Sequence, residues 1–162
     1  METSPTEFKT PGQLFQLLPG EWRGACRTWF GPGRLADESE VSGQIFPLLG
    51  GFLLRHEYAG TVQSQSRHGE ETIAHNKFTK QFEMSWIDSF HMNYAVMISK
   101  GEATSRGFVV KGEYDVSPDT PRWGWRTAYD LIDDDHLTIK AFNISPAGEE
   151  ALALQTMYER VK

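Results

Sequence analysis

The sequence contains a single cysteine, Cys26, among its 162 residues, so no disulfide can form within the chain. It also contains no run approaching the roughly 20 apolar residues that a membrane-spanning helix needs. Residues 1–10 are polar and hold no apolar core of the kind found in secretory signals. We therefore expect a soluble, cytoplasmic protein.

Basic residues are in deficit: 16 Lys and Arg stand against 22 Asp and Glu, for a formal net charge of −6. We find no basic stripe that would reverse this balance locally. An acidic surface repels phosphate backbones and anionic lipid headgroups. The charge therefore predicts that the protein binds neither nucleic acid nor membranes. It does not determine the oligomeric state, and a homodimer is possible.

Several enzyme motifs are absent, namely G-x-S-x-G, H-E-x-x-H and C-x-x-C. Residues 31–36 fit G-x-G-x-x-A, but a strand-like run follows them where a dinucleotide site needs a helix, so we interpret them as a hairpin loop. Residues 133–135, three consecutive Asp, lack the spacing of a calcium loop and predict a solvated turn. The motifs thus assign no catalytic residue, no metal ligand and no cofactor.

The segment over residues 11–18 predicts a short helix. Thr10 is a suitable N-cap, and Leu14, Leu17 and Leu18 fall on one helical face. A helix this short is not stable alone, so we expect it to pack on a core.

Turn residues are frequent beyond this helix; the chain has 15 Gly and eight Pro in all. They separate ten strand-like segments: 21–30, 38–46, 52–61, 71–76, 81–88, 94–100, 107–114, 123–132, 136–144 and 150–161. Regular spacing without a helical insertion predicts an all-β fold, an up-and-down antiparallel barrel of about ten strands closed at one end by the helix. We expect a flexible arm over residues 1–10 and one barrel domain over 11–162.

Gly20-Glu21-Trp22 opens the first expected strand, and Tyr158-Glu159-Arg160 closes the last. This pattern resembles the calycins, which include lipocalin-like and fatty-acid-binding-protein-like barrels. The resemblance implies that Arg160 packs across the ring of Trp22 and closes the base of the barrel. Such a contact combines a cation–π interaction with hydrogen bonds from the guanidinium to nearby carbonyl groups.

Four further segments occur in order at residues 17–22, 49–53, 86–89 and 146–149. Together they are similar to a family of mostly bacterial proteins described only as a domain of unknown function, whose members look like small calycin-type barrels. The W-I-D-S block at 86–89 is the most specific of the four. The resemblance implies a fold and carries over no catalytic residue.

Period-two alternation predicts which side chains face the barrel interior. The predicted ligand-binding residues are Phe52, Leu54, His56, Phe82, Met84, Trp86, Asp88, His91, Trp125 and Arg126. Most of them follow from alternation; His91, Trp125 and Arg126 follow from their positions beside the W-I-D-S and W-G-W segments. A barrel of this width needs large side chains, water or a ligand inside it.

We therefore expect a binding protein for a small hydrophobic or amphipathic ligand with one polar or acidic end, working without a cofactor. Three alternatives stay open. The barrel could hold haem through His56 or His91. It could be an enzyme that uses Asp88 with one of these histidines as an acid–base pair. Its interior could also be plugged by its own side chains. We interpret Cys26, which shares the inner face of its strand, as a buried thiol rather than a nucleophile.

Two local alternatives also remain. A buried carboxylate needs a cation or donors, so an inward Asp88 predicts Arg126, a histidine or backbone N–H groups beside it. Otherwise Asp88 only ties the end of its strand to the next turn. In the W-G-W-R segment, either both indoles pack in the barrel wall or Arg126 turns inward to meet an anion.

Overall fold

The computed structural model describes residues 9–162, which begin with helix α1 (Pro11–Leu17). Thr10 is its N-cap. The Thr10 hydroxyl accepts a hydrogen bond from the backbone N–H of Gln13, and the Gln13 side chain accepts one from the backbone N–H of Thr10. This reciprocal capping box explains why so short a segment forms a helix.

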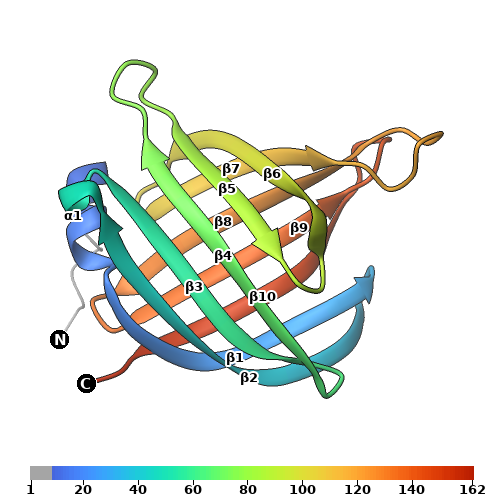
Figure 1. Ribbon diagram of the computed structural model, residues 1–162, viewed down its shortest axis with the longest axis horizontal. Coiled ribbons are helices and arrows are strands. Elements are labelled where there is room, and N and C mark those ends of the chain that lie inside the picture. Colours follow the sequence, from blue (N-terminus) through green and yellow to red (C-terminus); the bar gives the residue numbers. More distant parts are fainter. Residues whose placement is uncertain (1–8) are drawn as a thin grey trace, which may run out of the picture.

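Helix α1 lies at one end of the barrel (Figure 1). Leu14 and Leu18 are fully buried there, and the ring of Phe15 packs edge-on against that of Phe82. The predicted helix and its place at the end of the barrel are thus confirmed. No helix in the described part of the chain is long and apolar enough to cross a membrane. The predicted flexible arm lies outside the described residues, except for Lys9 and Thr10.

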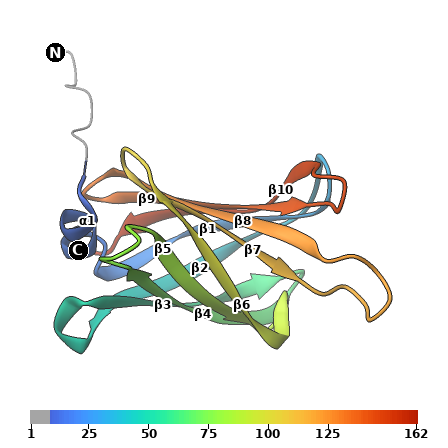
Figure 2. The ribbon, with the colours of Figure 1, turned by 90° about the horizontal axis from the view of Figure 1, so that it is seen from above.

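Ten strands follow the helix: β1 (Gly20–Gly31), β2 (Arg34–Leu48), β3 (Leu53–Val62), β4 (Gln65–His75), β5 (Phe82–Asp88), β6 (Met92–Ala103), β7 (Gly107–Tyr114), β8 (Trp123–Asp133), β9 (His136–Ile144) and β10 (Glu150–Arg160). A short 3-10 turn, η1 (Leu49–Gly51), joins β2 to β3. Each strand pairs antiparallel with its sequence neighbours, and β1 pairs with β10 to close the barrel (Figures 1 and 2). The predicted all-β, ten-stranded barrel is confirmed.

Strand β4 begins six residues earlier than the expected 71–76. The prediction was wrong here because the turn before β4 contains no glycine to mark it. Gln63 and Ser64 form this turn with φ values of 49° and 66°. Gly69, which looks like a turn residue in the sequence, lies within β4. A Cβ atom there would lie 2.2 Å from the hydroxyl oxygen of Tyr58, so this glycine makes room for a side chain of β3.

The interior near α1 is filled by apolar side chains, whose burial stabilises the fold by roughly 25 cal/mol per Å². The largest fully buried ones are Leu14, Leu18, Trp22, Ile45, Leu54, Ile73, Phe82, Phe108, Leu131 and Leu137. The ring of Phe108 stacks between those of Phe82 and Tyr129, at centroid distances of 4.5 and 4.7 Å. This end of the barrel is therefore packed shut.

The base is closed as the resemblance implies. The guanidinium carbon of Arg160 lies 4.3 Å from the centre of the Trp22 ring. Arg160 donates hydrogen bonds to the carbonyl oxygens of Leu17, Pro19 and Asp134, at 2.5, 2.7 and 2.8 Å. One side chain thus joins the helix end, the first strand and the β8–β9 turn.

Candidate functional site

Strand register brings three residues together in the middle of the barrel. His56 of β3 pairs with Glu71 of β4, which pairs with Trp86 of β5. All three are buried and face inward. Polar groups at this depth must find partners inside the protein.

His56 has such partners on both ring nitrogens. Its Nδ1 lies 2.7 Å from Oε1 of Glu71 and 2.9 Å from the hydroxyl of Tyr129, and its Nε2 lies 3.0 Å from the hydroxyl of Tyr158. The Tyr129 hydroxyl also donates to Oε1 of Glu71. Burial raises the pKa of Tyr129 and of Tyr158 above the usual range, so both remain neutral phenols. We call these four residues the His56 network.

A second group of contacts surrounds Asp88. Oδ2 accepts hydrogen bonds from the Tyr58 hydroxyl at 2.5 Å and from Nε of Arg67 at 2.9 Å. Oδ1 accepts two more, both at 2.7 Å, from the backbone N–H groups of Phe90 and His91. The buried carboxylate is therefore saturated by donors and paired with a buried cation.

These contacts set the protonation state of Asp88. Burial disfavours its charged form and would raise its pKa. The facing His91 ring, the charge of Arg67 and the Tyr58 hydroxyl outweigh burial and hold the pKa of Asp88 well below its usual range. Asp88 is thus an ionised carboxylate at neutral pH.

The W-I-D-S block now has a structural explanation. Nε1 of Trp86 donates to the hydroxyl of Tyr58 at 2.8 Å, and Asp88 accepts from the same hydroxyl. The hydroxyl of Ser89 accepts from the backbone N–H of His68 at 3.0 Å. The block therefore ties β5 to β3 and β4.

A cavity of about 40 Å³ lies between these groups. It is lined by Val41, His56, Tyr58, Arg67, Glu71, Trp86, Trp125, Thr127, Ile139, Ala141, Leu154, Thr156 and Tyr158. A water needs roughly 10–15 Å³ of such space, whereas typical ligand pockets reach about 300–1,000 Å³. The cavity can therefore hold a few waters or one polar group, but no complete ligand of ordinary size.

Two tryptophans lie on the side of the cavity that faces the open end. Trp86 and Trp125 stack with their centroids 5.2 Å apart and an angle of 20° between the rings, and both line the cavity. The ring of His91 contacts both, with centroids 6.0 and 5.7 Å away. Its Nδ1 is buried and faces Oδ1 of Asp88 at 3.6 Å, just beyond hydrogen-bond distance, with no closer partner among residues 9–162.

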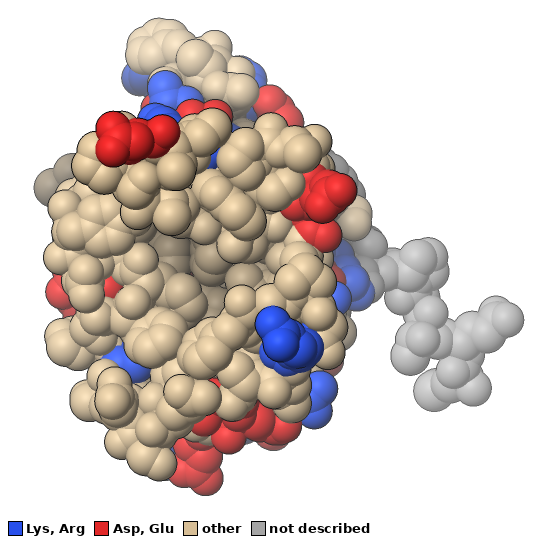
Figure 3. All heavy atoms as spheres, turned by 90° about the vertical axis from the view of Figure 1, so that its right-hand side faces the viewer, with Lys and Arg blue, Asp and Glu red and all other residues tan. Residues whose placement is uncertain are grey.

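An open hollow of about 510 Å³, which we call the vestibule, lies near the start of β8, and its residue Tyr114 contacts Trp125. It is lined by Tyr94, Tyr114, Asp115, Val116, Trp123 and Asn143. Tyr114, Trp123 and Asn143 have the same parity along their strands as the inward-facing residues of β7, β8 and β9. Figure 3 shows the hollow at this end of the molecule, bordered largely by uncharged side chains.

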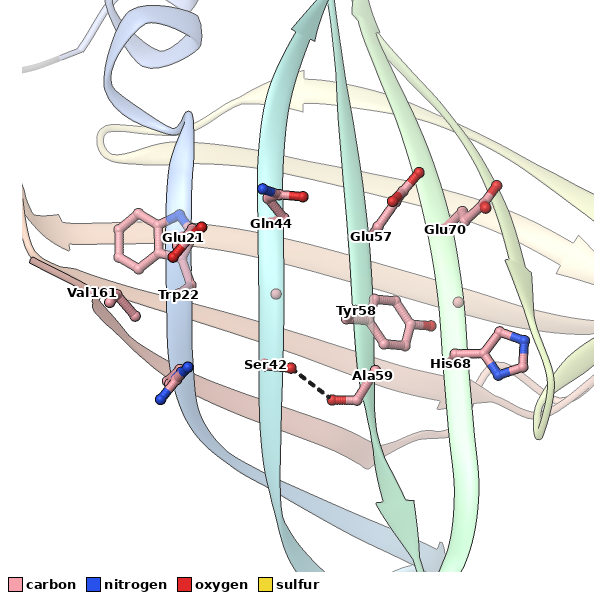
Figure 4. A pocket seen from close by; sticks show the side chains of 13 residues that line it. Glu21, Trp22, Ser42, Gln44, Glu57, Tyr58, Ala59, His68, Glu70 and Val161 are labelled. Carbon is pink, nitrogen blue, oxygen red and sulfur yellow. Dashed lines mark hydrogen bonds between the residues drawn. The ribbon is translucent and has the colours of Figure 1, made fainter.

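A third depression, of about 460 Å³, lies on the outer wall across β1 to β4 (Figure 4). Glu21, Gln44, Glu57 and Glu70 form one row there, each opposite the next on neighbouring strands. Like charges at such positions destabilise a sheet, and Arg55 offsets this by pairing with Glu70 at 3.0 Å. This acidic surface is separate from the interior.

Two of the predicted site residues do not face the interior. Phe52 is 81% exposed. Gly50 and Gly51 have φ values of 70° and 100° and turn the chain just before it, so the alternation of β3 does not extend back to Phe52. Arg126 lies between the inward Trp125 and Thr127 and therefore points outward. It pairs there with Glu150, at 3.0 and 2.8 Å.

The remaining predicted residues are buried or partly buried, at different depths. Leu54, Phe82 and Met84 belong to the apolar core rather than to the cavity wall. His56, Trp86 and Trp125 line the cavity, while Asp88 and His91 lie beside it. Whether any of them binds a ligand stays a prediction.

The sequence analysis missed several polar residues of the interior, among them Arg67, Glu71, Tyr129 and Tyr158. Arg67, not Arg126, is the cation that meets Asp88. One signal was present, because Arg67, Gly69, Glu71 and Ile73 alternate along β4. Within residues 9–162, no group of three or more His, Cys, Asp or Glu side chains is arranged to hold a metal ion.

The fold and its interior define a calycin-like barrel, closed at one end and hollow at the other. The chain belongs to the family described as "Protein of unknown function (DUF1579)", which matches residues 9–160. No curated protein matches the sequence significantly.

The chain is similar to several solved structures, of which two follow. The S-type phycobiliprotein lyase CPES of Guillardia theta has a TM-score of 0.57 and 12% identity, covering 95% of this chain and 94% of its own. A DUF3598 protein of unknown function from Nostoc punctiforme has a TM-score of 0.28 and 8% identity, covering 94% and 100%. At such identities the lyase match concerns the fold alone.

Proposed function

We propose that the barrel binds a small, partly apolar molecule through its open end, with the polar end of the molecule in the interior cavity. The observation that carries this proposal is the set of buried polar side chains gathered around a cavity. A barrel interior can be filled with apolar residues, as it is beside α1. Ligand sites combine apolar walls with a few converging polar groups, so the polar side chains around this void favour a binding role.

Arg67 is the residue best suited to contact the polar end. A guanidinium has five N–H groups. Nε donates to Asp88, and Nη1 donates to the sulfur of Cys26 at 3.4 Å. The remaining N–H groups of this cavity-lining side chain are available to an acceptor atom of the ligand, together with the hydroxyls of Thr127 and Thr156.

Asp88, in contrast, has a structural role in this proposal and does not contact the ligand. Its four donors leave it little capacity for a ligand, and its role is to hold Arg67 and Tyr58 in position. The same reasoning disfavours an acid–base pair built on Asp88. It also disfavours haem ligation by His56, because both ring nitrogens already have partners. At 12% identity, the similarity to a phycobiliprotein lyase supplies no ligand for this chain.

Filling the cavity tests the proposal. Ala141 is buried and lines the cavity, so Ala141→Val would occupy the space meant for the polar end without removing any hydrogen bond. Ala128, on the outer side of β8, provides a matched control variant, Ala128→Val.

Native mass spectrometry of protein purified from its own host should show a bound small molecule in the parent and in Ala128→Val. It should show none in Ala141→Val, and after removal of the bound molecule the three proteins should melt at similar temperatures. Retention of the molecule by Ala141→Val, or its absence from the parent, would overturn the proposal. A Soret absorbance band in the parent would identify haem instead.

A further inference from the structure

The interior cavity is too small to hold a partly apolar molecule, so the rest of the ligand must lie elsewhere. The vestibule offers about 510 Å³ beside it, within the range of small-molecule sites. We propose that the vestibule binds the flat, conjugated body of the ligand, entering where β6 separates from β7. This inference depends on the proposed function only for the position of the ligand's polar end.

The proposed place of entry is suggested by the strand pairing. The β6–β7 ladder is confined to Lys100–Ala103 opposite Phe108–Lys111, toward the end of the barrel that carries α1. The earlier part of β6 diverges from β7, as Figure 2 shows. Tyr94 of β6 and Tyr114 of β7, which both line the vestibule, lie where the two strands are no longer paired. The Tyr94 hydroxyl links the strands there by donating to the backbone carbonyl of Asp115 at 2.6 Å.

Aromatic rings continue from the vestibule to the cavity. Tyr94, Tyr114 and Trp123 form half of the residues that line the vestibule. The ring of Tyr114 meets that of Trp125 edge-on at 6.3 Å, and Trp125 stacks on Trp86. A planar conjugated body gains stacking and edge contacts with such rings in addition to apolar burial, whereas a saturated chain gains burial alone.

The polar groups of the vestibule favour a neutral body with a hydrogen-bond acceptor. The charge of Asp115 is offset by Nε of Arg122 at 3.1 Å. Tyr114 donates to Oδ1 of Asn143 at 2.5 Å, which orients the amide. The Nδ2 group of Asn143 can then donate to a carbonyl or ring nitrogen of the ligand.

Two probes with the same carboxylate end and similar carbon content separate the two ligand classes: 2-naphthoate, which is flat, and decanoate, which is flexible. Isothermal titration calorimetry on the full chain should find 2-naphthoate bound about tenfold more tightly than decanoate. Equal affinities, or no binding of 2-naphthoate, would overturn the inference.

Variants at Tyr94 locate the site. This side chain is 57% exposed, so its replacement is compatible with folding. Tyr94→Ala should weaken 2-naphthoate binding about fivefold or more, and Tyr94→Phe, which keeps the ring, should restore it. Phe52→Ala removes an exposed aromatic ring outside the vestibule and should change nothing.

The two proposals fail in different ways. If Ala141→Val abolishes the binding of both probes and Tyr94→Ala affects neither, the vestibule inference is wrong and the cavity function stands. If 2-naphthoate binding depends on Tyr94 but is unchanged in Ala141→Val, the vestibule site stands and the cavity function is wrong.

Discussion

The hydroxyl of Tyr158 lies directly over the backbone of Gly43, where a Cβ atom on residue 43 would be 2.2 Å from the phenol oxygen. The same Cβ would lie 3.0 Å from Nε2 of His56. A glycine in β2 thus provides the space in which the Tyr158–His56 hydrogen bond forms.

We therefore expect Gly43→Ala to lower the free energy of unfolding by about 1–3 kcal/mol, because the new methyl group must displace the tyrosine. Urea unfolding followed by circular dichroism measures the change. Gly12→Ala is the control: a Cβ at position 12 meets no atom within 4 Å, and because Gly12 lies in α1, alanine there should leave stability unchanged or raise it. A Gly43→Ala protein as stable as the parent would show that the contact is easily relieved.

Arg160 contacts the Trp22 ring and three backbone carbonyl groups. Arg160→Ala should therefore lower the free energy of unfolding by about 2–4 kcal/mol, since it removes charge-assisted hydrogen bonds and packing together. Arg160→Lys should recover little of this, because a single ammonium does not reproduce the planar fork. Replacing Arg34, which is exposed in the β1–β2 hairpin, by Ala should change stability by no more than about 0.5 kcal/mol.

Because of Asp88, the free energy of unfolding should fall as the solution becomes acidic. Its pKa is depressed in the folded protein, so its contribution is present above the unfolded-state pKa of about 4 and is lost as the pH falls toward the lower folded-state value. At pH 7, Asp88→Asn should cost about 3 kcal/mol because it leaves Arg67 without its anion.

The urea midpoints of the parent and of Asp88→Asn should be measured over the same series of pH values. The difference between the two midpoints should shrink steadily as the pH falls from 5 to 2. Asp119→Asn, in an exposed loop, is the control and should track the parent throughout. A difference that is independent of pH would mean that the charge of Asp88 is not what stabilises the fold.

Two phenylalanines that the sequence places on one predicted pocket wall should behave differently. Phe82 is fully buried, and Phe82→Ala should cost about 3–5 kcal/mol through the cavity it leaves. Phe52 is largely exposed, and Phe52→Ala should cost less than about 0.5 kcal/mol. Paired urea titrations test both, and similar losses in the two variants would contradict the position of Phe52 outside the barrel.

Much of the architecture could be predicted because its signals are local. Turn residues and alternation identify ten strands, the Thr10 cap and three leucines identify α1, and the G-x-W start with a terminal Arg indicates how the base closes. Alternation also placed His56 and Trp86 correctly inside, because both lie well within regular strands. It failed at Phe52, where two left-handed glycines break the period just before β3.

The sequence by itself therefore determined the barrel, the closed end and much of the inner face, since each depends on residues close together in the chain. Only the tertiary structure decided that Arg67 and Glu71 lie inside and that Arg67 is the cation beside Asp88. Arg67 is buried because Asp88 and Tyr58 meet it from other strands, and Glu71 because His56 and Tyr129 do. A buried charge is tolerated only when such partners surround it, and these partners come together only when the barrel closes.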